Sequence, residues 1–241
     1  MKNKISVIIL VLLLAACTGG TFSELQLAAA RGQTDMVAVM LDKGADINEM
    51  NRNGKTPLMM AAANGHTETV ELLLKRHAAI DAKDIDGVTA LMMAASSGET
   101  DTVAALIKAG ASVNVVNAYN SSAVTNAAFF NQVATLDELL KSKEKVKPDI
   151  GETALLIASG LGNDKIIQHL LDYGVDCNAR GKNGRTPLMA AVEFKHLSTV
   201  ELLLNHKANP KVMDTEGHSV MSIAENSGNK EIIALLKKNG G

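Results

Sequence analysis

The chain has 241 residues, with 24 Lys and Arg against 26 Asp and Glu, so its formal net charge is −2. A balance this close to zero provides no general attraction to nucleic acid, and we expect no nucleic-acid partner. With no Trp, two Tyr and four Phe, the core must be built from Ala, Leu, Ile, Val and Met, which favours closely packed helices over an aromatic-rich sandwich.

The N-terminal segment begins with Lys2 and Lys4, followed by a nearly uniformly apolar stretch over residues 5–16. A membrane-spanning helix needs about 20 apolar residues, which this stretch does not supply. A basic start, a short apolar stretch and small residues before a cleavage point are typical of a secretory signal. Residues 1–16 are therefore predicted to be a signal peptide.

The end of that segment, Leu14-Ala15-Ala16-Cys17, resembles the lipobox of bacterial lipoproteins. The resemblance implies cleavage before Cys17, acylation of Cys17 and a lipidated tether over residues 17–22, attached to the membrane through several acyl chains. Thr18, in place of Asp, favours the outer membrane, facing the periplasm or the cell exterior. Two alternatives remain: an ordinary signal peptide in which Cys17 is incidental, and a buried N-terminal helix.

Everything after the tether follows an internal repeat. The stretch GKTPLMMAAANG at residues 54–65 recurs at 87–98, a shift of 33, and related stretches begin at Gly151, Gly184 and Gly217. A weaker copy occupies residues 120–131, and residues 23–32 fit one period before the first full copy. About seven units therefore fill residues 23–241.

Each unit reads as two short helices joined by a turn. A Thr or Ser precedes the first helix as an N-cap, and Pro57 and Pro187 occupy its first position, where no N–H is needed. The first helix is Ala-rich and ends near a Gly such as Gly65, and the second has apolar residues at helical spacing, such as Val70 and Leu73. Neither helix buries its apolar face alone, so stability must come from stacking of neighbouring units.

These units resemble ankyrin repeats over residues 23–241, with the best match between Asn51 and His66. The resemblance implies an all-α ankyrin-repeat solenoid of about seven helix-turn-helix units joined by short β-hairpin-like turns. The chain departs from the family at the histidine of the Thr-Pro-Leu-His motif, which is replaced by Met59, Met92, Leu156, Met189 and Ser222. Methionine at this layer predicts adaptable apolar packing in place of fixed polar bridges.

The fourth repeat is irregular. Asn120 stands at the turn glycine, Asn131 stands at the helix-end glycine, and a Lys-rich segment fills residues 141–150. Thr153 then falls 31 residues after Ser122, so the next unit is expected to start two residues early. We expect a local distortion here, either a bend or a longer loop.

The sequence contains no recognisable catalytic, metal-binding or cofactor-binding arrangement, so we predict a protein that is not an enzyme and needs no cofactor. His66 is expected to be a hydrogen-bonding turn residue. Cys177 stands where other units have Ile47, Ile80 and Val113, which predicts a buried, inert thiol. A redox-protective protein that uses Cys177 or the methionines is the alternative of a different class.

Ankyrin resemblance implies a protein partner bound through the hairpin tips and the first-helix face. The candidate tip residues are Arg52, Lys55, Ile85, Tyr119 and Arg185, with Asp149, Ile150 and Glu152 at the fifth tip; the candidate first-helix residues are Phe129, Phe130, Leu161 and Phe194. Four of the six aromatic residues fall in this set, and aromatic anchors often dominate binding energy. The alternative for Phe129 and Phe130 is burial in space left by the missing glycines.

The sequence thus predicts a membrane-anchored ankyrin-repeat lipoprotein that acts as a protein–protein interaction module in the bacterial cell envelope. Two narrower functions remain open: an immunity protein that neutralises a toxin, and support of an envelope oxidative-stress enzyme. A purely structural, chaperone-like surface without a dedicated partner is a further alternative.

Overall fold

A computed structural model describes residues 22–240, so the predictions for the signal peptide, for Cys17 and for most of the tether lie outside the described residues. The described chain forms seven consecutive helix pairs: α2 (Glu24–Ala30) with α3 (Thr34–Asp42), α4 (Pro57–Ala63) with α5 (Thr67–Lys75), α6 (Ala90–Ser97) with α7 (Thr100–Lys108), α8 (Ala123–Phe129) with α9 (Val133–Leu140), α10 (Pro148–Leu161) with α11 (Asp164–Tyr173), α12 (Pro187–Glu193) with α13 (Leu197–Asn205), and α14 (Val220–Ser227) with α15 (Lys230–Lys238). The prediction of an all-α repeat fold is confirmed for this part of the chain, where an isolated β-bridge joins Met213 to Ser219.

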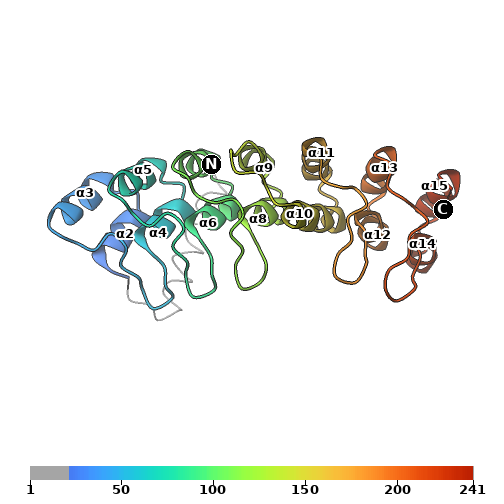
Figure 1. The fold of residues 1–241 in the computed structure, drawn as a ribbon, viewed down its shortest axis with the longest axis horizontal. Helices are drawn as coiled ribbons and strands as arrows, with labels where there is room; N and C mark the ends of the chain where they lie inside the picture. Colours follow the sequence, from blue (N-terminus) through green and yellow to red (C-terminus); the bar gives the residue numbers. More distant parts are fainter. Residues whose placement is uncertain (1–21, 241) are drawn as a thin grey trace. The chain divides into compact units, whose positions relative to one another are not determined.

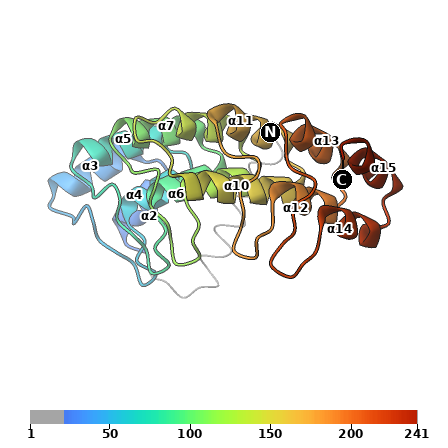
Figure 2. The same ribbon diagram turned by 45° about the vertical axis from the view of Figure 1, so that its right-hand side comes forward.

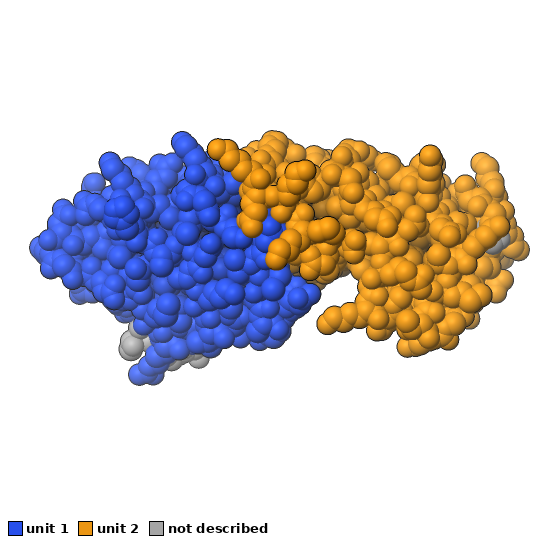
Figure 3. Space-filling view, viewed as in Figure 1, with its two compact units in different colours: residues 1–123 blue, residues 124–241 orange. Residues whose placement is uncertain are grey.

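The chain divides into two compact units, residues 1–123 (unit 1) and 124–241 (unit 2), which are coloured separately in Figure 3. In unit 1, helices α2, α4 and α6 pack side by side as an inner layer, and α3, α5 and α7 form the outer layer (Figures 1 and 2). Thr56 and Thr89 begin α4 and α6 by accepting hydrogen bonds from backbone N–H groups of the first turn. Leucines such as Leu58 and Leu73 are fully buried between the layers, so stacking supplies the core that one pair lacks.

Tight hairpins project from the inner layer of unit 1 at residues 51–55, 84–88 and 117–121. In each, the first residue donates its N–H to the carbonyl of the fifth, at 3.1, 3.0 and 2.9 Å. The side chains of Asn51, Asp84 and Asn117 each accept two backbone N–H bonds and so hold the turn. Neighbouring hairpins are joined by backbone bonds from Ile85 N–H to the Asn53 carbonyl and from Ala118 N–H to the Asp86 carbonyl, at 3.1 and 2.8 Å.

Unit 2 has the same two layers, with α8, α10, α12 and α14 inside and α9, α11, α13 and α15 outside (Figures 1 and 2). Its hairpins lie at residues 181–185 and 214–218, and Thr215 N–H donates to the Asn183 carbonyl at 3.0 Å to join them. The hairpin-like turns predicted between successive repeats are therefore present at five junctions of the described chain.

Helix α10 corrects the prediction for the fifth repeat. It has 14 residues where α4 and α12 have seven, and it begins at Pro148, so Asp149, Ile150 and Glu152 lie within its first turns and form no hairpin tip. Thr153 is not an N-cap, because it lies inside the helix. The cause is local: Pro148 favours extended backbone at the preceding Lys147 and suits the first helical position.

The fourth repeat, by contrast, keeps its turns. Asn120 and Asn131 adopt the left-handed conformation, with φ of 59° and 55°, that glycine supplies at the corresponding positions of other units. Asparagine tolerates this conformation better than most residues. The expected distortion therefore lies in the following repeat, at α10.

Polar side chains also connect neighbouring repeats. The ring Nε2 of His66 lies 2.9 Å from the Ala30 carbonyl oxygen, which confirms its predicted role, and Nε2 of His196 lies 3.0 Å from that of Gly160. Met59, Met92 and Met189 are buried at the layer where the family has histidine, as the sequence predicted. Within residues 22–240, no helix combines the length and apolarity needed to cross a bilayer.

Candidate functional site

The first candidate surface, here called the tip surface, lies on the hairpins of unit 1 and comprises Arg52, Lys55, Ile85 and Tyr119. Ile85 is 70% exposed and Tyr119 is 73% exposed. Arg52 is also exposed, whereas Lys55 is half-buried. Because the hairpins are bonded to one another through the backbone, these side chains stand on a connected support.

Tyr119 is oriented by the neighbouring hairpin. Its hydroxyl donates to Asp86 Oδ1 at 3.2 Å. This hydrogen bond and the negative charge of Asp86 raise the pKa of the Tyr119 phenol above its ordinary value. The ring is therefore presented as a neutral, partly fixed anchor, which lowers the entropy lost when a partner covers it.

The second candidate surface, here called the inner surface, lies in unit 2 and comprises the predicted first-helix residues Phe129, Phe130, Leu161 and Phe194 together with the predicted tip residue Arg185 of the 181–185 hairpin. The three Phe rings are 54, 52 and 60% exposed in chain order, so the alternative in which Phe129 and Phe130 fill the core is wrong. Phe129 and Phe130 pack edge to face with ring centroids 5.0 Å apart. The Phe194 ring lies beside Gly160, where an added methyl group would be 3.6 Å from its Cδ2.

Arg185 is fixed by a two-point ion pair that the sequence did not predict. Its Nη2 lies 2.9 Å from Glu193 Oε2 and its Nη1 lies 3.2 Å from Glu193 Oε1. The pair joins the last residue of the 181–185 hairpin to the last residue of α12. This geometry matches the planar guanidinium fork to a carboxylate and restrains both side chains.

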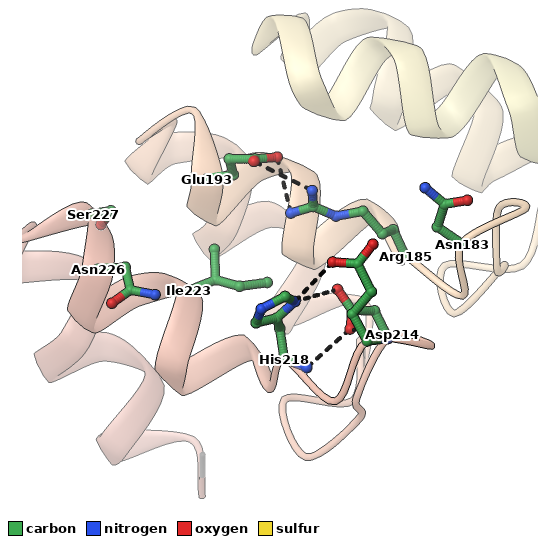
Figure 4. Close-up of a pocket in the computed structure, with 9 residues that line it drawn as sticks. Asn183, Arg185, Glu193, Asp214, His218, Ile223, Asn226 and Ser227 are labelled. Carbon is green, nitrogen blue, oxygen red and sulfur yellow. Dashed lines mark hydrogen bonds and ion pairs between the residues drawn. The ribbon is translucent and has the colours of Figure 1, made fainter.

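The same pair forms one wall of an open cavity in unit 2 (Figure 4). The cavity has a volume of about 440 Å³ and lies between the two hairpins and the ends of α12 and α14. Asp214, Glu216 and His218 of the 214–218 hairpin and Ile223 of α14 contribute to its lining. Sequence reasoning missed these residues, although Asp214 falls one period after Gly181 and starts its hairpin as Asp84 does in unit 1.

Cys177 is half-buried, which corrects the prediction of a fully buried thiol. Its Sγ donates to the His206 carbonyl oxygen at 3.1 Å. Burial, followed by the negative charge of Asp176, raises the pKa of the Cys177 thiol. A raised thiol pKa lowers the thiolate fraction and hence reactivity. Among residues 22–240, no group of three or more His, Cys, Asp or Glu side chains is arranged to hold a metal ion.

Paired short helices, projecting hairpins and stacked layers define this chain as an ankyrin-type solenoid. Residues 25–117 and 124–214 match the family model described as "Ankyrin repeats (3 copies)". The chain belongs to the ankyrin repeat family. Ankyrin repeats are modules of protein–protein interaction, and membership of this family suggests a protein partner.

The known proteins that resemble this chain do so through their ankyrin repeats. An ankyrin repeat-containing protein of Treponema pallidum (strain Nichols) is 37% identical over 82 residues, which is 34% of this chain and 28% of that protein. An ankyrin repeat protein of Rickettsia bellii (strain RML369-C) is 36% identical over 93 residues, 37% of this chain and 51% of that protein. The crystal structure of the human ASB11 ankyrin repeat domain superposes with a TM-score of 0.79 at 23% identity, over 91% of this chain and 99% of that one. The matched segments thus span about a quarter to a half of these bacterial relatives, and the structural likeness concerns the fold.

Proposed function

We propose that the chain is a lipid-anchored, non-enzymatic protein-binding module of the bacterial cell envelope. One observation supports dedicated binding above the others: in a chain with six aromatic residues, Tyr119, Phe129, Phe130 and Phe194 are each more than half exposed. Exposed aromatic rings on a repeat scaffold are costly to leave in water, and they are the residue types that dominate protein interfaces.

Binding by such surfaces works through shape already present before the partner arrives. The hairpins are joined through their backbones, the Tyr119 hydroxyl is bonded to Asp86, and the Arg185 guanidinium is bonded to Glu193. Little conformational entropy is therefore lost on association, and the exposed rings supply the buried apolar area.

The membrane attachment in this proposal rests on the lipobox-like residues that end at Cys17, with the outer membrane as the location. The redox-protective alternative is disfavoured at Cys177, whose thiol has a raised pKa, and at the buried Met59, Met92 and Met189. Met36, Met50 and Met213 are exposed, so this argument does not extend to them. Immunity to a toxin and support of an envelope enzyme are both compatible with a binding module.

Partner binding is tested by crosslinking the full chain in cell envelopes and identifying the captured proteins by mass spectrometry. Tyr119→Ala, the double variant Phe129→Ala/Phe130→Ala, and Phe194→Ala should each reduce capture of the same partner. Val39→Ala is the matched control, since Val39 is an exposed apolar residue of α3 outside both surfaces. Unchanged capture by all three surface variants, with helical content retained, would rule out binding through these faces.

Membrane attachment is tested separately with a Cys17→Ser variant. Wild-type protein should incorporate radiolabelled palmitate and fractionate with membranes, whereas the variant should lose the label and the anchored form. Labelling that persists in the variant would contradict acylation at Cys17.

A further inference from the structure

The cavity between the hairpins of unit 2 has a charge that its own residues do not balance. Three carboxylates line it, from Glu193, Asp214 and Glu216, against one guanidinium, from Arg185 (Figure 4). Glu193 and Arg185 neutralise each other in their two-point pair. Apart from that pair, Asp214 and Glu216 face only the ring of His218 among the basic groups of the lining, so the carboxylates outnumber the cations whether or not the ring is protonated.

Asp214 is held in the ionised state by the hairpin itself. Its Oδ1 accepts the backbone N–H groups of Glu216 and His218 at 3.0 and 2.9 Å. Burial alone would raise the pKa of this carboxyl, but these donors and the His218 ring outweigh burial and hold its pKa below the usual range. Its side chain is only 5% exposed, so the charge is fixed in position.

Glu216 offers the accessible carboxylate of the cavity. Its side chain is 69% exposed, and its Oε2 lies 3.6 Å from His218 Nδ1, which is beyond ordinary hydrogen-bond distance. His218 Nδ1 lies closer to Asp214, at 3.2 Å. Glu216 therefore keeps its capacity to accept a hydrogen bond from an incoming group.

The α14 side of the cavity offers one apolar side chain, Ile223, among polar ones. Ile223 projects from α14 toward the His218 side of the cavity, and the side chains of Asn226 and Ser227 add polar groups at the rim (Figure 4). Lysine and arginine side chains have this combination of needs, because their alkyl stems pack on apolar surface while their charged ends seek anions and water.

We propose that this cavity receives a lysine or arginine side chain of the bound protein partner, with Glu216 and Asp214 facing its charge and Ile223 contacting its stem. The inference rests on the proposed binding function and specifies the chemistry of one contact. A bare metal ion is a poorer occupant, because the described residues contain no group of three or more His, Cys, Asp or Glu side chains arranged to hold a metal ion.

The test uses the full chain with labelled isoleucine methyl groups and follows the Ile223 resonance by NMR. The probes are Nα-acetyl-lysine methylamide and Nα-acetyl-arginine methylamide, and Nα-acetyl-norleucine methylamide is the uncharged comparison. Both basic probes should shift the Ile223 methyl saturably, the norleucine probe should bind roughly fivefold more weakly, and added salt should weaken binding of the basic probes.

The decisive variant is Glu216→Gln, which should weaken binding of the basic probes roughly two- to fivefold. Glu201→Gln is its matched control, since Glu201 is an exposed carboxylate of α13 outside the cavity lining. Equal binding of the norleucine probe, no effect of Glu216→Gln, or tight binding of magnesium chloride in place of the probes would overturn the proposal. Failure of the probes while envelope capture still depends on the aromatic residues would reject the cavity inference alone; binding of the probes without any captured partner would reject the proposed function alone.

Discussion

Units 1 and 2 are built from the same repeat but differ in which of their repeats begin with a hairpin. Unit 1 has hairpins at residues 51–55, 84–88 and 117–121, joined through backbone bonds. Unit 2 has hairpins at 181–185 and 214–218, and in the repeat before them residues 148–153, the N-terminal part of helix α10, replace the turn. The buried leucines continue through both units. The stacked helix pairs are thus the obligatory part of this fold, and the hairpin is replaceable.

The connections between neighbouring repeats vary in the same way. In unit 1, the hydroxyls of Thr67 and Thr102 lie 2.7 Å apart, whereas in unit 2 the hydroxyl of Thr199 donates to the Asp164 carboxylate at 2.5 Å. Residues 22–123 have eight Lys and Arg against 12 Asp and Glu, and residues 124–241 have 14 of each. A shared stacking geometry therefore supports two surfaces of different charge, because packing depends on the apolar positions and leaves the exposed ones free to vary.

The largest expected effect tests whether each unit depends on its own core. Leu73→Ala in unit 1 and Leu170→Ala in unit 2 remove fully buried side chains from equivalent outer helices, and each should lower the free energy of unfolding by about 2 to 5 kcal/mol. Hydrogen exchange should show the greater loss of protection in the unit that contains the substitution. Equal loss in both units from either variant would contradict separate local cores.

A smaller effect is expected from substitutions at Gly54 and Gly151, which align in the sequence and which test the absence of a hairpin before α10. Gly54 has φ +74°, and an added Cβ would lie 2.9 Å from the Ile85 backbone nitrogen, so Gly54→Ala should cost at least about 1 to 2 kcal/mol. Gly151 lies inside α10, where an added Cβ would also be 2.9 Å from another atom, but that atom is Cγ2 of the Val175 side chain, which can shift more easily than backbone, and helix propensity favours alanine over glycine. Gly151→Ala should therefore stay within about 1 kcal/mol of wild type in chemical denaturation. The reverse order of the two costs would contradict the assignment of Gly151 to a helix.

A third comparison concerns one buried hydroxyl. Ser159 of α10 is fully buried, and its Oγ has no hydrogen-bond partner among the described residues, whereas Ala95 holds the aligned position in α6. Ser159→Ala should raise the free energy of unfolding by about 1 kcal/mol, because it removes an unsatisfied polar group. Ala95→Ser should lower it by about 1 to 3 kcal/mol for the converse reason. Denaturant titration measures both, and a destabilised Ser159→Ala variant would mean that the hydroxyl is satisfied.

The smallest expected effect concerns Cys177, which replaces the aliphatic residues Ile47, Ile80 and Val113 of unit 1. In a Cys17→Ser background, Cys177 should react with iodoacetamide more slowly than glutathione does near neutral pH, and the rate should rise as the pH approaches the raised thiol pKa. Cys177→Val should leave the thermal midpoint nearly unchanged. Alkylation faster than that of glutathione near neutral pH would instead favour a redox function.

The repeat, its period, the N-capping threonines and the buried methionines could all be predicted, because each depends on residues close together in the chain or on a pattern repeated many times. The exposed positions of Ile85, Tyr119 and Phe194 followed from their place within the repeat. Helix α10 was missed because the aligned glycine at 151 matched the pattern, while Pro148, three residues earlier, set the start of the helix. The half-exposure of Cys177 was missed because alignment gives a residue's position in the repeat but does not show how far neighbouring side chains cover it.

The sequence by itself determined that short paired helices must stack, because no single pair buries its own apolar face. Only the tertiary structure decided which exposed groups meet: the Tyr119 hydroxyl with Asp86, the Arg185 guanidinium with Glu193, and the carboxylates of Asp214 and Glu216 around one cavity. Those encounters bring together side chains from different hairpins and helices. Their distances depend on how successive turns pack, which residue spacing along the chain does not specify.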